Sequence, residues 1–243
     1  MSRAESWIGR REFIVTAAAA GFGAMAMRPG ACAEEKQGRA ISLFNGKTLD
    51  GWTEIQNKPA SPPTAGWMVK DGAMASIGQG RGVIYTTGDY GRFRLMFTMR
   101  HVSGAPDHQA CVLIFCTRPA GDEKPLDALG GIQFQVPNGG HWDYRPGKNT
   151  DGGAEFTRVV NPQFDLHTWS RVEILADAAT GRARMAVAQP PDSKAVEVLD
   201  FVDPTAGKVG PIAWQMHNAG LFDEYKDVTI EVDPKVDRLV TVG

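Results

Sequence analysis

Cysteine is scarce in this sequence, with three in 243 residues. Cys111 and Cys116 lie five positions apart in one apolar run that is typical of a buried strand. An odd offset places the two side chains on opposite faces of a strand, too far apart for a disulfide bond. We therefore interpret both as buried free thiols, and exclude a disulfide-stabilised scaffold and a cysteine-based metal site.

The sequence also lacks an excess of positive charge, since 26 basic residues face 28 acidic ones. Nothing in this balance favours a nucleic-acid partner. After the first 33 residues no apolar run is long enough to cross a membrane, so we expect a chain that does not span one.

The first 33 residues resemble an export signal rather than part of a fold. Arg10 and Arg11 precede an Ala- and Gly-rich apolar run over residues 15–27, and Ala31-Cys32-Ala33 matches a cleavage signal. This layout predicts a Tat signal peptide over 1–33, recognition by the Tat machinery, and a periplasmic or secreted protein. An uncleaved membrane anchor is the alternative, but the run is short and rich in glycine and alanine.

Long helical periodicity is absent from the rest of the chain. Short alternating or apolar segments recur instead, separated by glycine and proline, as at residues 93–99, 110–117, 172–174, 196–202 and 228–232. This spacing predicts an all-β domain over residues 34–243, a two-sheet antiparallel β-sandwich or jelly roll with its core at about 40–233. Trp52, Trp67 and Trp169 are predicted core residues, and the tail after Asp233 reads as a short extension.

Two of the predicted strands, residues 131–136 and 211–217, carry amides on one side. Because successive side chains in a strand alternate between faces, Gln133 and Gln135 share one face of the first strand. Gln215 and His217 likewise share one face of the second, and the other faces are apolar. The amide faces are either solvated surface or the floor of a polar ligand site.

A long irregular stretch over residues 137–155 follows the first of these strands. It holds His141, Trp142, Asp143, Tyr144 and Arg145 among glycines, and a loop of this length in a compact domain is usually functional. We expect no cofactor, because no spacing such as H-x-x-x-H supports a metal; a divalent ion held by His, Asp and Glu stays an alternative.

An ordered set of motifs resembles the 3-keto-disaccharide hydrolase domain family. The set covers nearly all of the chain after residue 33, and consists of SLFNGKTLDGW (42–52), WMVKDG (67–72), YGRF (90–93), GIQFQ (131–135), Trp169 and GPIAWQMH (210–217). The resemblance implies a concanavalin A-like fold and activity on 3-keto-glycosides. Family members usually carry Glu where this chain has Gln133.

The implied reaction needs a general base, a donor for an enolate oxygen and an acid for the leaving group. His217 is the candidate base, because histidine titrates near neutral pH, and His141 or Asp143 is the candidate second acid or base. Candidate substrate-binding residues are Gln133, Gln135, Gln215, Trp142, Tyr144 and Arg145.

The predicted function is therefore that of an exported hydrolase or lyase of 3-keto-glycosides or related glycosides. The rival hypothesis is a non-catalytic carbohydrate-binding module, which would present amides and aromatic rings without a titratable cluster. A structural β-sandwich that covers the amide face with another segment is a third alternative.

Overall fold

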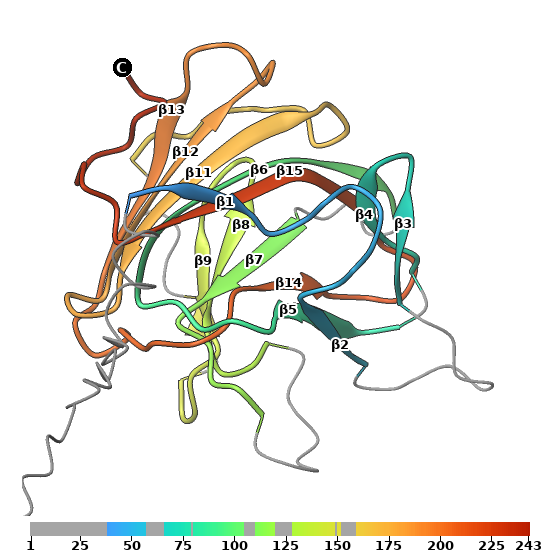
Figure 1. The fold of residues 1–243 in the computed structure, drawn as a ribbon, viewed down its shortest axis with the longest axis horizontal. Coiled ribbons are helices and arrows are strands. Elements are labelled where there is room, and N and C mark those ends of the chain that lie inside the picture. The colour runs from blue at the N-terminus through green and yellow to red at the C-terminus, as the bar shows by residue number, and fades with distance from the viewer. Residues whose placement is uncertain are drawn as a thin grey trace, which may run out of the picture.

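The chain folds as two antiparallel β-sheets packed face to face (Figure 1). The structure is a computed structural model that describes residues 38–56, 66–78, 80–104, 110–119, 128–148, 150–151 and 159–243. Within these ranges there are fifteen strands and no helix, and therefore no helix that is long and apolar enough to cross a membrane. The predicted all-β sandwich is confirmed, whereas the predicted signal at 1–33 lies outside the described residues.

Sheet A is the larger sheet, with eight strands. In spatial order it holds β13 (Val196–Val202), β12 (Arg182–Ala188), β11 (Ser170–Asp177), β6 (Arg92–Ser103), β15 (Phe222–Val232), β4 (Ala73–Ser76) and β3 (Trp67–Lys70), with β1 (Ala40–Ser42) also on β15.

Sheet B has seven strands. In spatial order it holds β10 (Thr150–Asp151), β9 (His141–Asp143), β8 (Ile132–Val136), β7 (Ala110–Ile114), β14 (Ala213–Met216), β5 (Gly82–Thr86) and β2 (Trp52–Gln56). The strands β9 and β10 fall inside the stretch that the sequence suggested was irregular.

Alternation along the strands builds the core between the sheets. The odd positions of β6 point inward, and the inward positions of sheet B meet them. Trp214 is fully buried there, with its ring centroid 5.2 Å from Tyr225 and 5.7 Å from Phe97. Burial of large apolar side chains at about 1.5–3 kcal/mol each makes this layer the main source of stability.

Each sheet also carries a small apolar cluster on its outer face, the face turned away from the other sheet. On sheet B, Leu113 and Tyr85 belong to a cluster covered by Ala128 and Leu129. On sheet A, Leu239 of the C-terminal segment packs on β11 and β12. The segment after β15, residues 233–243 and red in Figure 1, therefore lies against the sheet rather than as a free extension, and we call it the strap.

Two sequence-based expectations about side-chain position are wrong. Cys116 shares the outer face of sheet B with Cys111 and Leu113, because β7 ends at Ile114 and Phe115 takes a positive φ of 54°, which interrupts the alternation. Both thiols are free and buried, as predicted. Trp169 is only half-buried and lies outside the core, since its ring is covered by the Arg100 guanidinium at 4.6 Å and the Lys226 ammonium at 4.3 Å.

Candidate carbohydrate site

Three predicted amides meet on the outer face of sheet B. Strand register pairs Gln215 of β14 with Cys111 of β7, and Cys111 in turn with Gln135 of β8. Their inward neighbours Trp214, Val112 and Phe134 fill the core, so the amides and the thiol face away from sheet A. Alternation in the sequence predicted which residues share a face within each strand. The strand register shows that the amides of different strands lie side by side.

Gln133 lies diagonally across from Cys111 on the same face. Its Nε2 donates to Cys111 Sγ at 2.9 Å, and the side chain is 2% exposed. Its Oε1 is buried and has no hydrogen-bond partner in the part of the chain that the structure describes. The thiol therefore fixes the amide with its oxygen buried and unsatisfied, and such an acceptor favours a donor such as a hydroxyl.

Cys111 is the residue that sequence reasoning missed at this site. The apolar run around it favoured a packing role, and the run alone gives no reason to connect it with the amides. Cys111 and Leu113 are two positions apart in β7, so the sequence does predict that they share a face. That prediction becomes informative about the site only once β7 is known to lie between β8 and β14.

The aromatic residues of the predicted loop flank the amides. Trp142 of β9 is the register partner of Gln133, so both face outward, and its ring centroid lies 6.1 Å from that of Tyr144. Trp142 is half-buried and Tyr144 packs against the outer apolar cluster. This pair adds an aromatic edge to the amide face, the combination that suits the apolar and hydroxyl surfaces of a sugar.

His217 follows β14 directly and lies two positions beyond Gln215. It is half-buried. The structure thus brings the predicted base to the end of the strand that carries Gln215, next to the amide face. Its role as a base stays a prediction.

His141 and Asp143 lie on the opposite side of β9 from Trp142. Their register partners Phe134 and Ile132 are core residues, and the His141 ring stacks edge-on against Phe201 at 5.1 Å. The structure therefore does not place these two predicted acid or base groups on the amide face. The sequence could not predict that His141 and Asp143 face away from Trp142, because residues 141–143 were not recognised as a strand.

Asp143 is held by Arg145. The Arg145 Nε lies 3.0 Å and the Nη2 2.7 Å from its carboxylate oxygens, and Arg145 Nη2 also reaches Asp203 at 2.6 Å. Burial raises the pKa of Asp143, but the hydrogen bonds and charge of Arg145 outweigh burial and lower it overall. Arg145 therefore ties β9 to the segment after β13, and joins the two sheets.

A second titratable pair, unselected by sequence reasoning, lies on sheet A. His101 Nδ1 is 2.8 Å from Asp223 Oδ1, and both side chains are buried. Burial raises the pKa of Tyr225, and the charge of Asp223 raises it further. The register of β6 on β15 creates this pair, and the sequence gives no signal for that register.

The described residues contain no group of three or more His, Cys, Asp or Glu side chains that could hold a metal ion. The described side chains of the amide face offer hydrogen bonding, aromatic stacking and the His217 imidazole.

Comparison with solved structures supports the fold. The chain is similar to a candidate glycosyl hydrolase from Parabacteroides distasonis, with a TM-score of 0.53 and 16% identity over 79% of this chain and 93% of that one. It is also similar to a carbohydrate-binding module from Bacillus subtilis, with a TM-score of 0.55 and 12% identity over 79% and 99%. For winged bean acidic lectin in complex with methyl-α-D-galactose the values are 0.51, 10%, 79% and 97%.

A search of curated proteins found no match. The model of the 3-keto-alpha-glucoside-1,2-lyase-like domain matches residues 39–231, which span all fifteen strands but the last residue of β15. The solved structures show that the chain has a lectin-like jelly-roll fold. The family match over most of its length shows that the chain belongs to the 3-keto-alpha-glucoside-1,2-lyase-like family.

Proposed function

We propose that this protein cleaves 3-keto-glycosides at the outer face of sheet B by base-assisted elimination followed by hydration. One observation carries the proposal: the family match extends over residues 39–231, and inside it Gln133, Gln135 and Gln215 converge on one face beside His217.

The ketone at C3 of the sugar makes the reaction accessible to modest catalytic groups. It acidifies the proton on C2, so a base removes that proton while the C3 oxygen gains enolate charge. The C1–O bond then breaks, its electron pair leaves with the aglycone, and a C1=C2 double bond forms. Water adds back with its oxygen on C1 and its proton on C2, which completes hydrolysis.

Residues of this chain fit two of the three roles. His217 takes the C2 proton, since an imidazole has an ordinary pKa near 6.5. The amides of Gln215 and Gln135 donate N–H groups to the enolate oxygen or to ring hydroxyls. The Trp142 ring supports an apolar sugar face. A sugar hydroxyl reaches the buried Gln133 Oε1 only once the groups that cover it have moved aside. Among the described residues the amide face supplies no acid for the leaving group, because the predicted His141 and Asp143 lie on the opposite side of β9.

Non-catalytic carbohydrate binding is the second candidate, and Gln133 favours it. A neutral amide stands where the family usually has a carboxylate, and it cannot take up or release a proton. The resulting amide and aromatic face suits a binding module.

The deciding experiment incubates the purified chain with glycosides and their 3-keto derivatives, and follows release of the aglycone. We expect turnover of 3-keto substrates only, and its loss in His217→Ala. His167→Ala, at an exposed histidine before β11, serves as the matched control and should keep activity. Saccharide binding without turnover of any substrate would establish the binding module instead.

We also propose that the protein is exported by the Tat machinery to the periplasm or beyond. The support is the sequence of residues 1–33, with Arg10 and Arg11 ahead of an apolar run and a small-residue cleavage signal.

A further inference from the structure

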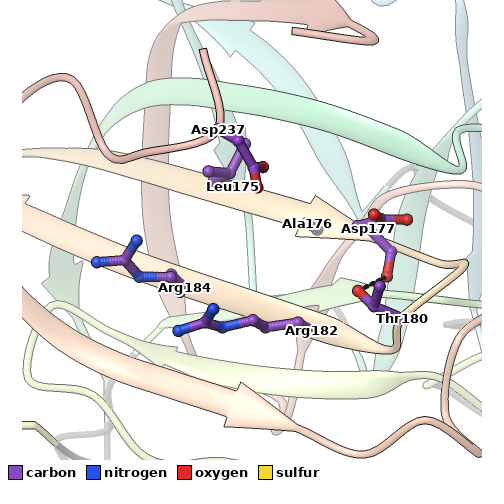
Figure 2. Close-up of a pocket in the computed structure, with 7 residues that line it drawn as sticks. All are labelled: Leu175, Ala176, Asp177, Thr180, Arg182, Arg184 and Asp237. Atoms are coloured by element: carbon purple, nitrogen blue, oxygen red, sulfur yellow. Dashed lines mark hydrogen bonds between the residues drawn. The ribbon is translucent and has the colours of Figure 1, made fainter. Parts of the chain in front are cut away.

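A polar pocket lies on the outer face of sheet A, on the other side of the molecule from the amide face. Its floor is Leu175 and Ala176 of β11, and its volume is about 160 Å³. Figure 2 shows two arginines of β12 beside this floor, with Asp237 above Leu175. The walls come from three separate segments, and consist of Asp177, Thr180, Arg182, Arg184 and Asp237.

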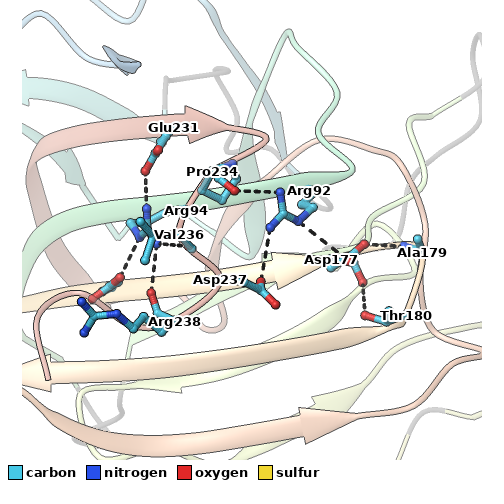
Figure 3. A network of polar contacts seen from close by, with 11 residues as sticks. Arg92, Arg94, Asp177, Ala179, Thr180, Glu231, Pro234, Val236, Asp237 and Arg238 are labelled. Carbon is cyan, nitrogen blue, oxygen red and sulfur yellow. Dashed lines mark hydrogen bonds and ion pairs between the residues drawn. The ribbon is translucent and has the colours of Figure 1, made fainter. Parts of the chain in front are cut away.

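The wall that carries Asp237 is fixed by the sheet beneath it (Figure 3). Arg94 Nη2 donates to the carbonyl oxygens of Val236 at 2.7 Å and Arg238 at 3.0 Å, on either side of Asp237. Arg92 Nη2 donates to Asp237 Oδ1 at 3.3 Å. The strap is therefore held in place without a ligand, and the pocket is preorganised.

The pocket offers unused hydrogen-bond donors. Arg184 pairs with Glu197 through Nε at 2.6 Å and Nη2 at 2.7 Å, and Arg182 pairs with Asp200 in the same way at 3.0 and 2.7 Å. In the described part of the chain neither guanidinium has a further hydrogen-bond partner, so the two N–H groups of each Nη1 are open. The bidentate pairs hold both donor groups in a fixed orientation.

Acceptors lie on the opposite wall. Asp237 is 80% exposed and only one of its oxygens contacts Arg92. Asp177 accepts from the Ala179 amide through Oδ1, while its Oδ2 lies 4.0 Å from the Arg92 guanidinium. A molecule in the pocket would therefore meet guanidinium donors on one side and carboxylate acceptors on the other.

The charges at the pocket exclude a site built for an anion. The three guanidinium groups of Arg92, Arg182 and Arg184 face four carboxylates, which belong to Asp177, Glu197, Asp200 and Asp237. The net charge of these groups is −1, which disfavours an anion even though the Nη1 groups are open. A neutral polyhydroxylated molecule meets no such repulsion, and each of its hydroxyls both donates and accepts.

We propose that this pocket is a second carbohydrate-binding site, which takes a neutral saccharide ring and is separate from the amide face. It holds no aromatic ring, so it recognises hydroxyl groups by charge-assisted hydrogen bonds. A site on each outer face would let the chain stay bound to a glycan while the amide face engages another unit, which raises the effective concentration of sugar at that face.

Titration of the ¹⁵N-labelled chain by NMR tests the proposal. The probes are trehalose and methyl α-glucoside, with glucuronate as the anionic comparison and glycerol as the small polyol. We expect saturable shifts of the Arg182 and Arg184 Nε–H signals and of the Thr180 amide with both neutral saccharides. Glucuronate and glycerol should bind more weakly.

Variants assign the shifts to the pocket. Arg184→Gln and Asp237→Asn should each weaken binding by about tenfold, the loss expected for one hydrogen bond to a charged group. Arg118→Gln, at a partly exposed arginine that follows β7 of sheet B, is the matched control and should bind as the wild type does. Unfolding midpoints of all three check that they are folded.

His217→Ala separates this proposal from the proposed function. It should abolish turnover and leave the Arg184 shifts unchanged. The second site is refuted if neutral saccharides cause no saturable shift at these signals, if glucuronate binds more tightly than they do, or if neither pocket variant weakens binding.

Discussion

The strap that closes the outer face of sheet A depends on one buried ion pair, and its removal should destabilise the domain strongly. Arg94 Nε lies 2.8 Å from Glu173 Oε1, with 5% and 0% of the two side chains exposed. Arg94 also pairs with Glu231 and donates to two strap carbonyls. Glu173 accepts from the backbone N–H groups of Val240 at 2.9 Å and Thr241 at 2.8 Å.

Arg94→Met removes the cation and keeps the length of the side chain. It leaves the Glu173 carboxylate buried without its counter-charge, and two strap carbonyls without their donor. Loss of one partner of a buried ion pair costs about 3–5 kcal/mol, because the remaining charge stays desolvated. For a domain of this size that corresponds to a fall in Tm of roughly 6–20 °C.

Urea unfolding followed by tryptophan fluorescence measures this change. Arg182→Met is the matched control, since its pair with Asp200 lies on the same face but is 49% and 32% exposed; it should cost about 1 kcal/mol or less. Arg94→Met/Glu173→Met should be less destabilised than Arg94→Met alone, because no buried charge is left. The reasoning is refuted if Arg94→Met costs no more than Arg182→Met.

Three further predictions follow from buried polar groups, charge and sequence. Tyr225→Phe should raise the free energy of unfolding by about 1 kcal/mol in urea titrations, because the Tyr225 hydroxyl is buried without a partner within the described residues; a loss of stability would contradict this. Hydrogen bonds from Thr205 first, and then from Arg145, lower the pKa of Asp203 to about 2, so its contribution to stability is present above about pH 4 and disappears as pH falls through 2. The Tm of the wild type should therefore fall between pH 4 and pH 2, and Arg145→Gln should make this fall smaller. A variant whose Tm falls as much as that of the wild type would contradict the prediction. Arg10→Lys together with Arg11→Lys should retain the protein in the cytoplasm of its host in fractionation experiments, and undiminished export would exclude the Tat route.

The strands were predictable from the sequence because buried apolar residues alternate with other residues along them. On β6 from Phe93 to Met99, and on β8, every second residue is apolar and buried, so the fold class and the face of each glutamine could be predicted. The order of strands within the sheets could not, because it depends on which distant segments pair. Gln133 and Gln215 become parts of one face only through β7, which lies between their strands.

The short strand β9 and the strap show a different limit. β9 has three residues, preceded by Gly139 and Gly140, and three residues are too few to establish a period. Its pairing with β8 therefore decides that Trp142 faces outward and His141 inward. The strap has no periodicity at all, and is held by the contacts of Leu239 and by backbone groups that bond to Arg94 and Glu173, which no sequence pattern reveals.

The presence of an amide rather than a carboxylate at Gln133 bears on both candidate functions. A carboxylate at this position, 2% exposed and beside a thiol that its neighbour strand supplies, would be desolvated and would resist ionisation. The amide avoids that cost, and the Cys111 thiol orients it so that the oxygen accepts. With an amide at this position, the proposed base is His217 beside the amide face. A lyase built this way relies on one base and on neutral donors, which is sufficient when the C3 ketone has already acidified the proton to be removed, and insufficient for an ordinary glycoside.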